Sequence, residues 1–231
     1  MSETLIAARR LSAGYNKMAV VREVDLHVDA GEVVALIGPN GAGKTTTLLT
    51  LAGELTPHEG EVHFLGEATR SAMHVRCRSG LGYVTEERSV IMEMSVADNL
   101  KLAAVPHKVA CEYFPALEPI MGRRAGLCSG GEQQMLSLAR ALGRNPKVLL
   151  ADELSLGLAP KIVTSLLKSV RDAATKRGTG VLLVEQHVRQ ALSISDRVYV
   201  MQRGRIALTG TSAEIAGQLD KVESAYLSTN S

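Results

Sequence analysis

The sequence predicts an α/β fold: a parallel sheet core preceded by antiparallel strands, with an inserted α-helical lobe. Three observations support this prediction. Apolar strand-like runs alternate with amphipathic helix-like segments over residues 147–210, as a parallel sheet with crossover helices requires. An apolar run at 32–37 passes through a glycine-rich loop directly into a helix-like segment. Between about residues 90 and 145, the pattern becomes mostly helical.

The expected elements follow from residue patterns taken in chain order. Strands need apolar or alternating runs, and we expect them at 5–15, 22–28, 32–37, 60–66, 80–84, 147–153, 180–186 and, as a pair, at 197–210. Helices need apolar residues three or four apart, and we expect them at 44–53, from 95 onward, at 130–142, 159–178 and 189–195. Ser95 and Asp98 have the spacing of a helix N-cap and its third residue. No repeat or long linker interrupts the chain, so we expect one domain, residues 1–231, with the lobe at about 90–145.

Composition narrows the possible partners and compartment. The 231 residues are 45% hydrophobic with a formal net charge of +2, and both signs of charge are mixed along the chain. No basic stripe tracks a nucleic-acid backbone, so nucleic acid is not an expected partner. Cys77, Cys111 and Cys128 lack metal-type spacing and are expected to be free thiols in a reducing compartment. No signal peptide or apolar run of about 20 residues is found, so we expect a cytoplasmic protein that reaches a membrane only through a partner.

The segment "GPNGAGKT" at 38–45 fits the phosphate-loop pattern GxxxxGK[ST]. Such a loop points backbone N–H groups at an anion, and the following helix adds the positive end of its dipole. Lys44 would reach the β and γ phosphates, and the Thr45 hydroxyl would coordinate Mg²⁺. The alternative is a plain glycine turn between a strand and a helix. The predicted nucleotide-binding residues all lie in this loop and the next helical turn: Gly38, Pro39, Asn40, Gly41, Ala42, Gly43, Lys44, Thr45 and Thr46.

Two acidic residues, Asp152 and Glu153, end the apolar strand "VLLADE". Adjacent residues at a strand's carboxyl edge point to different sides, at the edge where α/β proteins bind ligands. Asp152 is expected to hold Mg²⁺, and Glu153 to orient or deprotonate the water that attacks the γ-phosphate. An acidic pair in this place also serves as a helix N-terminal charge or turn, and the phosphate loop upstream favours the catalytic interpretation.

The segment "CSGGEQQ" at 128–134 precedes a long amphipathic helix. Ser129 and Glu132 have the spacing of a capping box, which is the structural explanation. That box does not explain Gly130 and Gly131, since glycine costs up to about 1 kcal/mol per residue in a helix. Two bare N–H groups beside a hydroxyl make a second anion site. Ser129 lies 91 residues after Gly38, so one chain need not close both sites on one nucleotide.

These motifs resemble those of the ATPase subunits of ATP-binding cassette (ABC) transporters, from Tyr15 to about Gly210. The resemblance implies a P-loop NTPase fold with a RecA-like core, ATP and Mg²⁺ as cofactors, and a head-to-tail dimer. It implies that the segment at 128–134, the family's signature, contacts ATP held by the partner subunit through Ser129, Gly130, Gly131 and Glu132. It also implies that the Tyr15 ring stacks on adenine. The alternative for Tyr15 is a half-buried strand tyrosine.

The finer resemblance is to the subunits that drive branched-chain amino-acid importers. The segments "SGGEQQM", "ELSLGLAP", "LLVEQ", "YVTEER" and "SVADNL" are similar to that subgroup's versions of the motifs. The resemblance implies an ATPase at the inner face of the cell membrane that drives paired permeases, with a solute-binding protein involved indirectly. The second ATPase is either a second copy or a related chain.

Three positions depart from the wider family. Glu86 stands where most members have a glutamine that senses Mg²⁺, and it is assigned to the metal side of the site. Leu154 replaces a proline, which frees an N–H. Ala159 replaces an aspartate, so a contact across the dimer at this loop is expected from backbone or from Ser155.

Two other functions stay open from the sequence. One is a soluble P-loop phosphotransferase, although no acceptor site is recognisable. The other is a non-hydrolysing, ATP-dependent interaction module, in which departures near Glu153 have stopped turnover.

The last predicted site residue lies in the stretch "VEQHV" at 184–188. The resemblance places a γ-phosphate histidine directly after the position of Glu185, where this chain has Gln186. Because side chains alternate along a strand, His187 cannot take that place unless the chain bulges. We therefore predict that Gln186 faces the phosphate, joins Glu153 and Lys44 as a catalytic residue, and leaves His187 near the surface. Glu185 itself is set aside.

Overall fold

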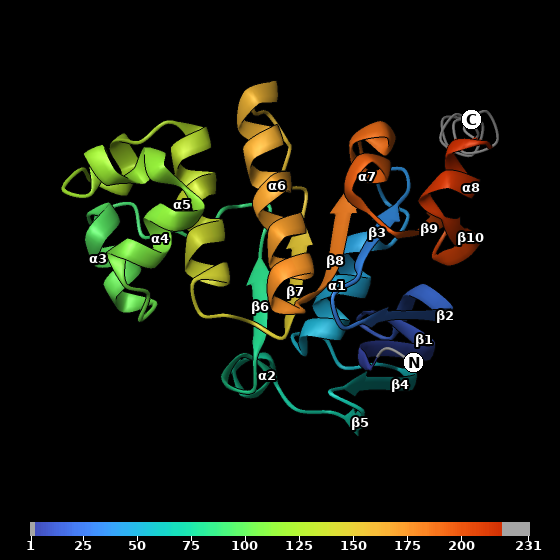
Figure 1. Cartoon of the computed structure of the whole chain (residues 1–231). Coiled ribbons are helices and arrows are strands. Elements are labelled where there is room, and N and C mark those ends of the chain that lie inside the picture. Colours follow the sequence, from blue (N-terminus) through green and yellow to red (C-terminus); the bar gives the residue numbers. More distant parts are fainter. Residues whose placement is uncertain (1–2, 219–231) are drawn as a thin grey trace.

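Two sheets and their flanking helices make up the structure, a computed structural model that describes residues 3–218 (Figure 1). One sheet has four strands in the order β2-β1-β4-β5, and the other has six in the order β10-β9-β3-β8-β7-β6. The strands span β1 Thr4–Tyr15, β2 Met18–Asp29, β3 Val33–Ile37, β4 Glu59–Phe64, β5 Glu67–Thr69, β6 Leu81–Val84, β7 Val148–Asp152, β8 Gly180–Glu185, β9 Arg197–Gln202 and β10 Arg205–Thr211. The predicted fold class is confirmed.

The helices lie on both faces of the larger sheet and to one side of it (Figure 1). They span α1 Lys44–Ala52, α2 Met73–Arg78, α3 Val96–Leu102, α4 His107–Tyr113, α5 Gly130–Leu142, α6 Pro160–Arg177, α7 Val188–Ile194 and α8 Ser212–Ala216, with short 3-10 helices η1 Pro115–Ile120 and η2 Ala125–Leu127. The expected helices at 44–53, 130–142, 159–178 and 189–195 all form, with small shifts at their ends.

The larger sheet is buried on both faces, as the continuous apolar runs predict. β3 pairs in parallel with β8 and β9, and β7 pairs in parallel with β8 and β6. Successive residues of one strand enter different cores because side chains alternate across the sheet. In β7, Leu149 packs with the α5 and α6 side chains, whereas Leu150 packs with those of α1 and the smaller sheet. The sheet is thus fixed between two apolar layers.

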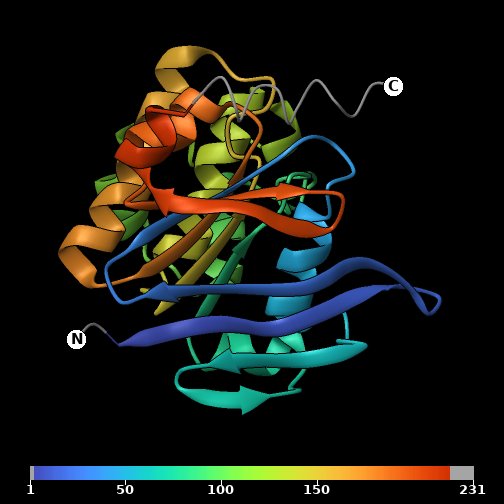
Figure 2. The same cartoon turned by 90° about the vertical axis from the view of Figure 1, so that its right-hand side faces the viewer.

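The smaller sheet is antiparallel and covers the face of the larger sheet that also carries α1. β1 pairs with both β2 and β4, and β5 adds to β4. Figure 2 shows these four strands side by side, with β9 and β10 above them. Leu11 and Val24 from this sheet and Leu48 from α1 are fully buried in the same core. The N-terminal strands therefore support the helix that begins at the phosphate loop.

Helices α3, α4 and α5 lie together on the left of Figure 1, beside β6. Ser95 caps α3 by accepting a hydrogen bond from the Asp98 N–H at 3.0 Å, as its spacing predicts. Phe114, Leu117 and Leu136 are buried where these elements meet. The region expected to be a helical lobe thus contains the helices, in shorter pieces than a continuous helical pattern suggests.

Three short elements escape the sequence prediction: β5, α2 and α8. α2 has six residues and no side-chain N-cap, and its place is set by the buried Arg76, which donates to the Leu51 carbonyl at the end of α1. α8 begins at a capping box of Thr211 and Glu214, a sequence signal that the pattern reading overlooked. Tertiary contacts and caps, rather than periodicity, define these segments.

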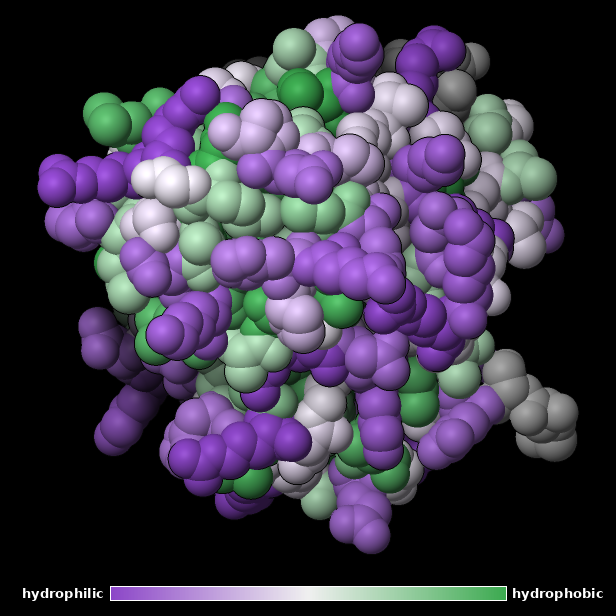
Figure 3. Space-filling view, turned by 60° about the vertical axis from the view of Figure 1, so that its left-hand side comes forward, coloured by the Kyte–Doolittle hydropathy of each residue, from purple (hydrophilic) through white to green (hydrophobic). Residues whose placement is uncertain are grey.

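The three cysteines are free thiols, as expected. In residues 3–218, no helix has both the length and the apolar character needed to cross a membrane. The face toward the helices on the left of Figure 1 is largely hydrophilic, with hydrophobic residues in small separate groups (Figure 3).

Candidate active site

Four neighbouring parallel strands, in the order β3-β8-β7-β6, end at one edge of the larger sheet. The phosphate loop follows β3, Gln186 follows β8, Asp152 ends β7, and Glu86 lies in the loop after β6. Parallel strands bring their carboxyl ends to one edge, where ligands bind in open α/β sheets. The structure therefore brings together the residues predicted for phosphate, metal and water.

The phosphate loop has backbone geometry that only glycine takes easily. Gly41 and Gly43 have φ values of +76° and +105°, in the left-handed region. At Gly38, an added Cβ would lie 2.3 Å from the Met201 carbonyl oxygen of β9. Gly43 is the N-cap of α1 and provides no side-chain hydrogen bond. Because glycine has no side chain, the first N–H groups of α1 receive no hydrogen bond from an N-cap side chain, as an anion-binding helix end requires.

The Lys44 side chain folds back onto its own loop. Its Nζ donates to the carbonyl oxygens of Gly38 at 2.8 Å and Pro39 at 3.1 Å, and the residue is 5% exposed. Burial lowers the pKa of Lys44, while the carboxylates of Glu153 and Asp152 act in the opposite direction. The ammonium group is thus held close to both acidic residues.

Asp152 is a buried carboxylate with one unpaired oxygen. It is 2% exposed, and its Oδ1 has no hydrogen-bond partner among the described residues. Burial, with the charges of Glu153 and Glu86, raises the pKa of Asp152 to about 6, although a hydrogen bond from Thr45 and the charge of Lys44 act in the opposite direction. A buried acid with a free oxygen beside a threonine hydroxyl has the chemistry of a divalent-cation ligand.

No cluster of three or more His, Cys, Asp or Glu residues that could hold a metal by itself occurs within residues 3–218.

Glu153 lies in a strained turn directly after β7. Its φ is +48°, a left-handed value that costs free energy for any residue other than glycine. Its N–H donates to the Val184 carbonyl at 3.0 Å, and its Oε1 accepts from Gln186 Nε2 at 2.7 Å. Neighbouring groups from β8 and the residue after it therefore hold the carboxylate. Asp152 and Glu153 therefore have different surroundings.

Gln186 and His187 differ as the alternation of side chains predicts. β3 and β8 pair without a register shift up to Glu185, so no bulge occurs in this part of the strand. Gln186 is partly buried and turned toward Glu153, whereas His187 is exposed and is the N-cap of α7.

Tyr15 and Glu86 are both exposed. Tyr15 ends β1 with 48% of its surface accessible, which is compatible with both a ring that stacks on adenine and a half-buried strand tyrosine. Glu86 is in the loop after β6, and its charge acts on Asp152. The Glu86 side chain is accessible to a ligand that enters at this edge.

The signature residues form a second group at the start of α5. Ser129 Oγ accepts from the Glu132 N–H at 3.3 Å, and the Ser129 N–H donates to Glu132 Oε2 at 2.6 Å, so the predicted capping box is present. In Figure 1, β6 and β7 lie between α5 and α1. The structure thus keeps the signature group apart from the phosphate loop of its own chain.

The two signature glycines also have packing partners that the sequence did not reveal. An added Cβ would lie 3.0 Å from the Arg88 guanidinium at Gly130, and 3.2 Å from the Ile162 side chain at Gly131. The Ile162 side chain would have to shift slightly to admit a methyl group at Gly131, whereas the flexible Arg88 side chain can move away from Gly130. Arg88 comes from the loop after β6, so no local sequence signal connects it to α5.

Sequence reasoning also missed the link between Glu185 and Ser155. Glu185 is 1% exposed and accepts two hydrogen bonds from Ser155, 30 residues away. An acidic residue at the end of an apolar strand was the available signal, but the sequence could not identify its partner.

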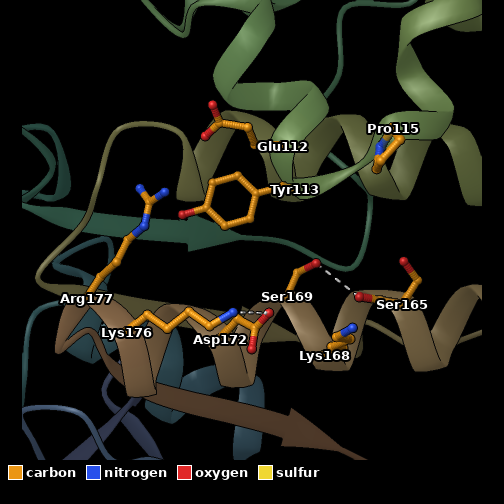
Figure 4. Close-up of a pocket in the computed structure, with 9 residues that line it drawn as sticks. All are labelled: Glu112, Tyr113, Pro115, Ser165, Lys168, Ser169, Asp172, Lys176 and Arg177. Carbon is orange, nitrogen blue, oxygen red and sulfur yellow. Dashed lines mark hydrogen bonds and ion pairs between the residues drawn. The ribbon is translucent and has the colours of Figure 1, made fainter.

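A separate cavity of about 410 Å³ lies between α4 and α6, lined by Tyr113 and Arg177 among others (Figure 4). Lys176 pairs there with Asp172 at 3.1 Å, and the Arg177 guanidinium lies over the Tyr113 ring at 4.9 Å. None of the predicted site residues line this cavity. It therefore belongs to the junction between the two helices and not to the sheet edge.

Comparisons with known proteins show the family of this chain. A family model described as "ABC transporter" matches residues 21–155. The probable branched-chain amino acid transport ATP-binding protein LivF of Archaeoglobus fulgidus is 37% identical over 217 residues, which cover 89% of this chain and 92% of that protein.

A lipopolysaccharide export system ATP-binding protein, LptB of Acidithiobacillus ferridurans, is 38% identical over 227 residues, 93% of each chain. Among solved structures, the ADP conformation of MJ1267, an ATP-binding cassette of an ABC transporter, has a TM-score of 0.86 and 25% identity. The match covers 97% of this chain and 98% of that chain. The chain therefore belongs to the ABC transporter family, as an ATP-binding subunit that hydrolyses ATP for transport.

Proposed function

We propose that this ATPase drives an importer of branched-chain or related amino acids. The observation that carries the proposal is the set of motif variants "SGGEQQM", "ELSLGLAP" and "LLVEQ", which resemble those of that importer subgroup. The relative LivF, named for branched-chain amino acid transport, supports it over 89% of this chain. In this proposal, residues 1–231 are a single nucleotide-binding domain that works at the cytoplasmic face of the membrane.

The geometry supports a division of labour in hydrolysis. The N–H groups of the phosphate loop and of the first turn of α1 bind the phosphates. Lys44 leaves the carbonyls of Gly38 and Pro39, which it now contacts, for the β and γ phosphates. Glu153 orients the attacking water as a general base, and Gln186, already bonded to it, donates its amide hydrogens toward the γ-phosphate. Tyr15 stacks on the adenine ring.

Mg²⁺ would be held by Thr45 and Asp152 together with ATP oxygens, with Glu86 on the same side. The unpaired Oδ1 of Asp152 supports this assignment. When bound, the ion neutralises phosphate charge. The residues of the chain supply the rest: a buried acid, a hydroxyl and an ammonium group placed around one volume at the sheet edge.

A second ATPase subunit completes the site in this proposal. Ser129, Gly130, Gly131 and Glu132 lie apart from the phosphate loop of the same chain, so they would contact ATP bound to the partner. The partner is a second copy or a related chain. Closure of the two subunits on two ATP molecules would then move the paired permeases, and a solute-binding protein would deliver the solute.

A groove of about 610 Å³ is a candidate docking place for a permease segment. It lies between α2, β6, α3 and α5, and Cys77, Leu102 and Arg140 are among its lining residues. Leu102 is 60% exposed, which suits an apolar partner. Arg140 bonds the Ser89 carbonyl of the loop that also contains Glu86. Movement in the groove would therefore reach the metal side of the site.

Cys77 makes docking measurable, because it lines the groove while Cys111 on α4 does not. Both thiols are partly exposed. We expect a copurified permease complex to protect Cys77 from alkylation and to leave Cys111 reactive. Equal reactivity of both thiols in the complex and in the free subunit would contradict this docking place.

The proposed function is tested by purifying the chain with its membrane partners and reconstituting the complex in vesicles. ATP hydrolysis stimulated by a branched-chain amino acid with its binding protein, and uptake of that amino acid, are expected. Glu153→Gln should stop hydrolysis while ATP binding remains. No hydrolysis by the wild-type chain would favour an interaction module, and turnover that needs a small-molecule acceptor would favour a phosphotransferase.

Lipopolysaccharide export is a second candidate because a relative named for that system, LptB, is 38% identical over 93% of this chain. The same reconstitution separates the two candidates. Stimulation by lipopolysaccharide, with no response to amino acids, would replace the importer proposal.

A further inference from the structure

Glu185 presents a buried carboxylate that one serine holds. The residue ends β8 and is 1% exposed. Ser155 Oγ donates to Glu185 Oε2 at 2.6 Å, and the Ser155 N–H donates to Oε1 at 3.2 Å. No lysine, arginine or histidine within residues 3–218 forms an ion pair with it at 4.0 Å or less. Hydrogen bonds from a single residue of another loop are therefore its main compensation for burial.

A carboxylate in this place needs an explanation beyond packing. Burial raises the pKa of Glu185, and the two hydrogen bonds from Ser155 act against that change. Burying a charge without a cation is costly, and apolar side chains of similar volume fill such places at lower cost. The rest of β8, Gly180 to Val184, is fully apolar and buried. The carboxylate is thus an exception within its own strand.

The two hydrogen bonds from Ser155 to Glu185 are among four that hold the same turn. The residues after β7, at 153–155, contact three consecutive residues at the end of β8. Glu153 N–H donates to the Val184 carbonyl, Ser155 donates to Glu185, and Gln186 donates to Glu153. Glu153 has a left-handed φ of +48°, and such strain persists only where the surroundings fix it.

The turn also sets how the following loop is presented. Ser155 is 5% exposed, and its hydroxyl is already donated within its own chain. It is therefore not available for the contact across the dimer that the sequence left open for it. Leu156, the next residue, is 44% exposed, and Gly157 has open space around it. Leu156 is therefore the large apolar side chain that this loop exposes.

We propose that Glu185 is a positioning residue for ATP hydrolysis. It anchors Ser155 and so holds the turn at 153–155 in the strained form that aims the Glu153 carboxylate and turns Leu156 outward. The inference rests on the proposed role of Glu153 as general base. Glu185 itself touches no reacting atom in this account, and its effect passes through Ser155.

The test compares kcat and KM for ATP in Ser155→Ala, Glu185→Gln, Glu185→Ala and the double alanine variant. We expect kcat to fall about tenfold in the single alanine variants, since small misplacements of a catalytic group have effects of this size or larger. KM should change by less than about twofold, because the phosphate loop is not involved. Glu185→Gln keeps one acceptor and should lie between wild type and Glu185→Ala. The double variant should be no slower than Glu185→Ala, because each single substitution already removes the same interaction between Ser155 and Glu185.

Ser169→Ala on α6 is the matched control. It also removes a buried hydroxyl that donates a hydrogen bond, but Ser169 is not part of the proposed site. If Ser155→Ala and Glu185→Gln keep the kcat of Ser169→Ala, the inference is overturned. It is also overturned if kcat falls only in proportion to the folded fraction measured by circular dichroism. If Glu185→Ala does not fold, Ser155→Ala and Glu185→Gln still test the positioning role. Glu153→Gln is assayed in parallel. If Glu153→Gln hydrolyses ATP at the wild-type rate, both the general-base role of Glu153 and the positioning role of Glu185 are overturned. If Glu153→Gln loses hydrolysis while Ser155→Ala keeps the wild-type rate, only the positioning role is overturned.

Discussion

Gln186 donates a hydrogen bond from Nε2 to Oε1 of Glu153 at 2.7 Å, across a separation of 33 residues. The amide therefore faces the carboxylate proposed to orient water, while the neighbouring His187 is exposed at the start of α7. An amide has hydrogens to donate and no proton to lose near neutral pH, so it can orient Glu153 without competing for the role of base.

Gln186→Ala should reduce the rate of ATP hydrolysis about tenfold or more, because the general base loses the group that holds it. His187→Ala should stay within about twofold of wild type. Steady-state ATPase assays at saturating ATP measure both effects. A loss in His187→Ala together with normal rates in Gln186→Ala would mean that the strand end is bulged and that the assignment of the two residues is reversed.

The raised pKa of Asp152, about 6, makes a prediction about stability without nucleotide. The carboxyl binds its proton more tightly in the folded chain than in the unfolded chain, where its pKa is near 3.9. Stability is therefore lost as pH rises from about 4 to about 6, and the loss stays complete above that range. Asp152→Asn removes this loss, and it should stabilise the nucleotide-free protein at pH 7.5 by on the order of 2 kcal/mol.

Thermal unfolding in the presence of a chelator measures this effect at pH 7.5 and at pH 5. The stabilisation by Asp152→Asn should be clearly smaller at pH 5, where part of the wild-type loss has not yet developed. Glu67→Gln, which removes a carboxylate from the exposed surface of β5, is the control for a change in net charge. A stabilisation that is the same at both pH values, or that is absent, would contradict the prediction.

Residues 3–218 contain two capping boxes of nearly identical geometry, and only one lies in the signature. The N–H of Glu132 donates to Ser129 Oγ at 3.3 Å, and that of Glu214 donates to Thr211 Oγ1 at 3.3 Å. Ser129→Ala and Thr211→Ala should each destabilise the chain by about 1 kcal/mol, the usual cost of a lost N-cap. Only Ser129→Ala should also lower ATP hydrolysis, because its hydroxyl is proposed to contact the partner's ATP.

Denaturant unfolding gives the two free energies, and ATPase assays at concentrations that allow dimer formation give the rates. Comparable loss of activity in both variants would show that Ser129 acts only as a helix cap. An unchanged rate in Ser129→Ala would remove it from the nucleotide site.

Much of the site could be predicted because its residues follow directly after strands or form short contiguous motifs. The phosphate loop, Asp152 and Glu153, and the box of Ser129 with Glu132 are local patterns with local physical reasons. Glu185 and Ser155 are different, because their bond depends on the register between β7 and β8. The contact of Arg88 with α5 likewise joins segments that are distant in sequence.

The missed parts of the fold have the same origin. α2 and α8 have six and five residues, too few to give a periodic apolar pattern. Arg76 fixes α2 by donating to backbone carbonyls at the end of α1. Backbone carbonyls leave no signal in the sequence, so Arg76 would be expected to be a charged surface residue. Local patterns predict where elements begin, and tertiary contacts decide which short segments become elements.

Gly38 and Gly41 lie in one loop but are required for different physical reasons. At Gly38 an added Cβ would meet the Met201 carbonyl oxygen at 2.3 Å, and a backbone atom of a central strand cannot move aside cheaply. At Gly41 nothing lies within 4 Å, and the obstacle is the φ of +76°. Gly41→Ala should therefore fold and lose about 1 kcal/mol, the cost of a left-handed alanine.

Gly38→Ala should lose about 3 kcal/mol, because the loop must separate from β9 to admit the methyl group. Denaturant unfolding without nucleotide isolates this steric effect from any contact with phosphate. Since the N–H of Gly204 also bonds the Ala42 carbonyl at 2.9 Å, displacement of the loop should loosen the turn between β9 and β10. Faster amide exchange at Gly204 in Gly38→Ala, but not in Gly41→Ala, is the expected result. Equal destabilisation of the two variants would mean that backbone conformation, and not the approach to Met201, determines the need for glycine at both positions.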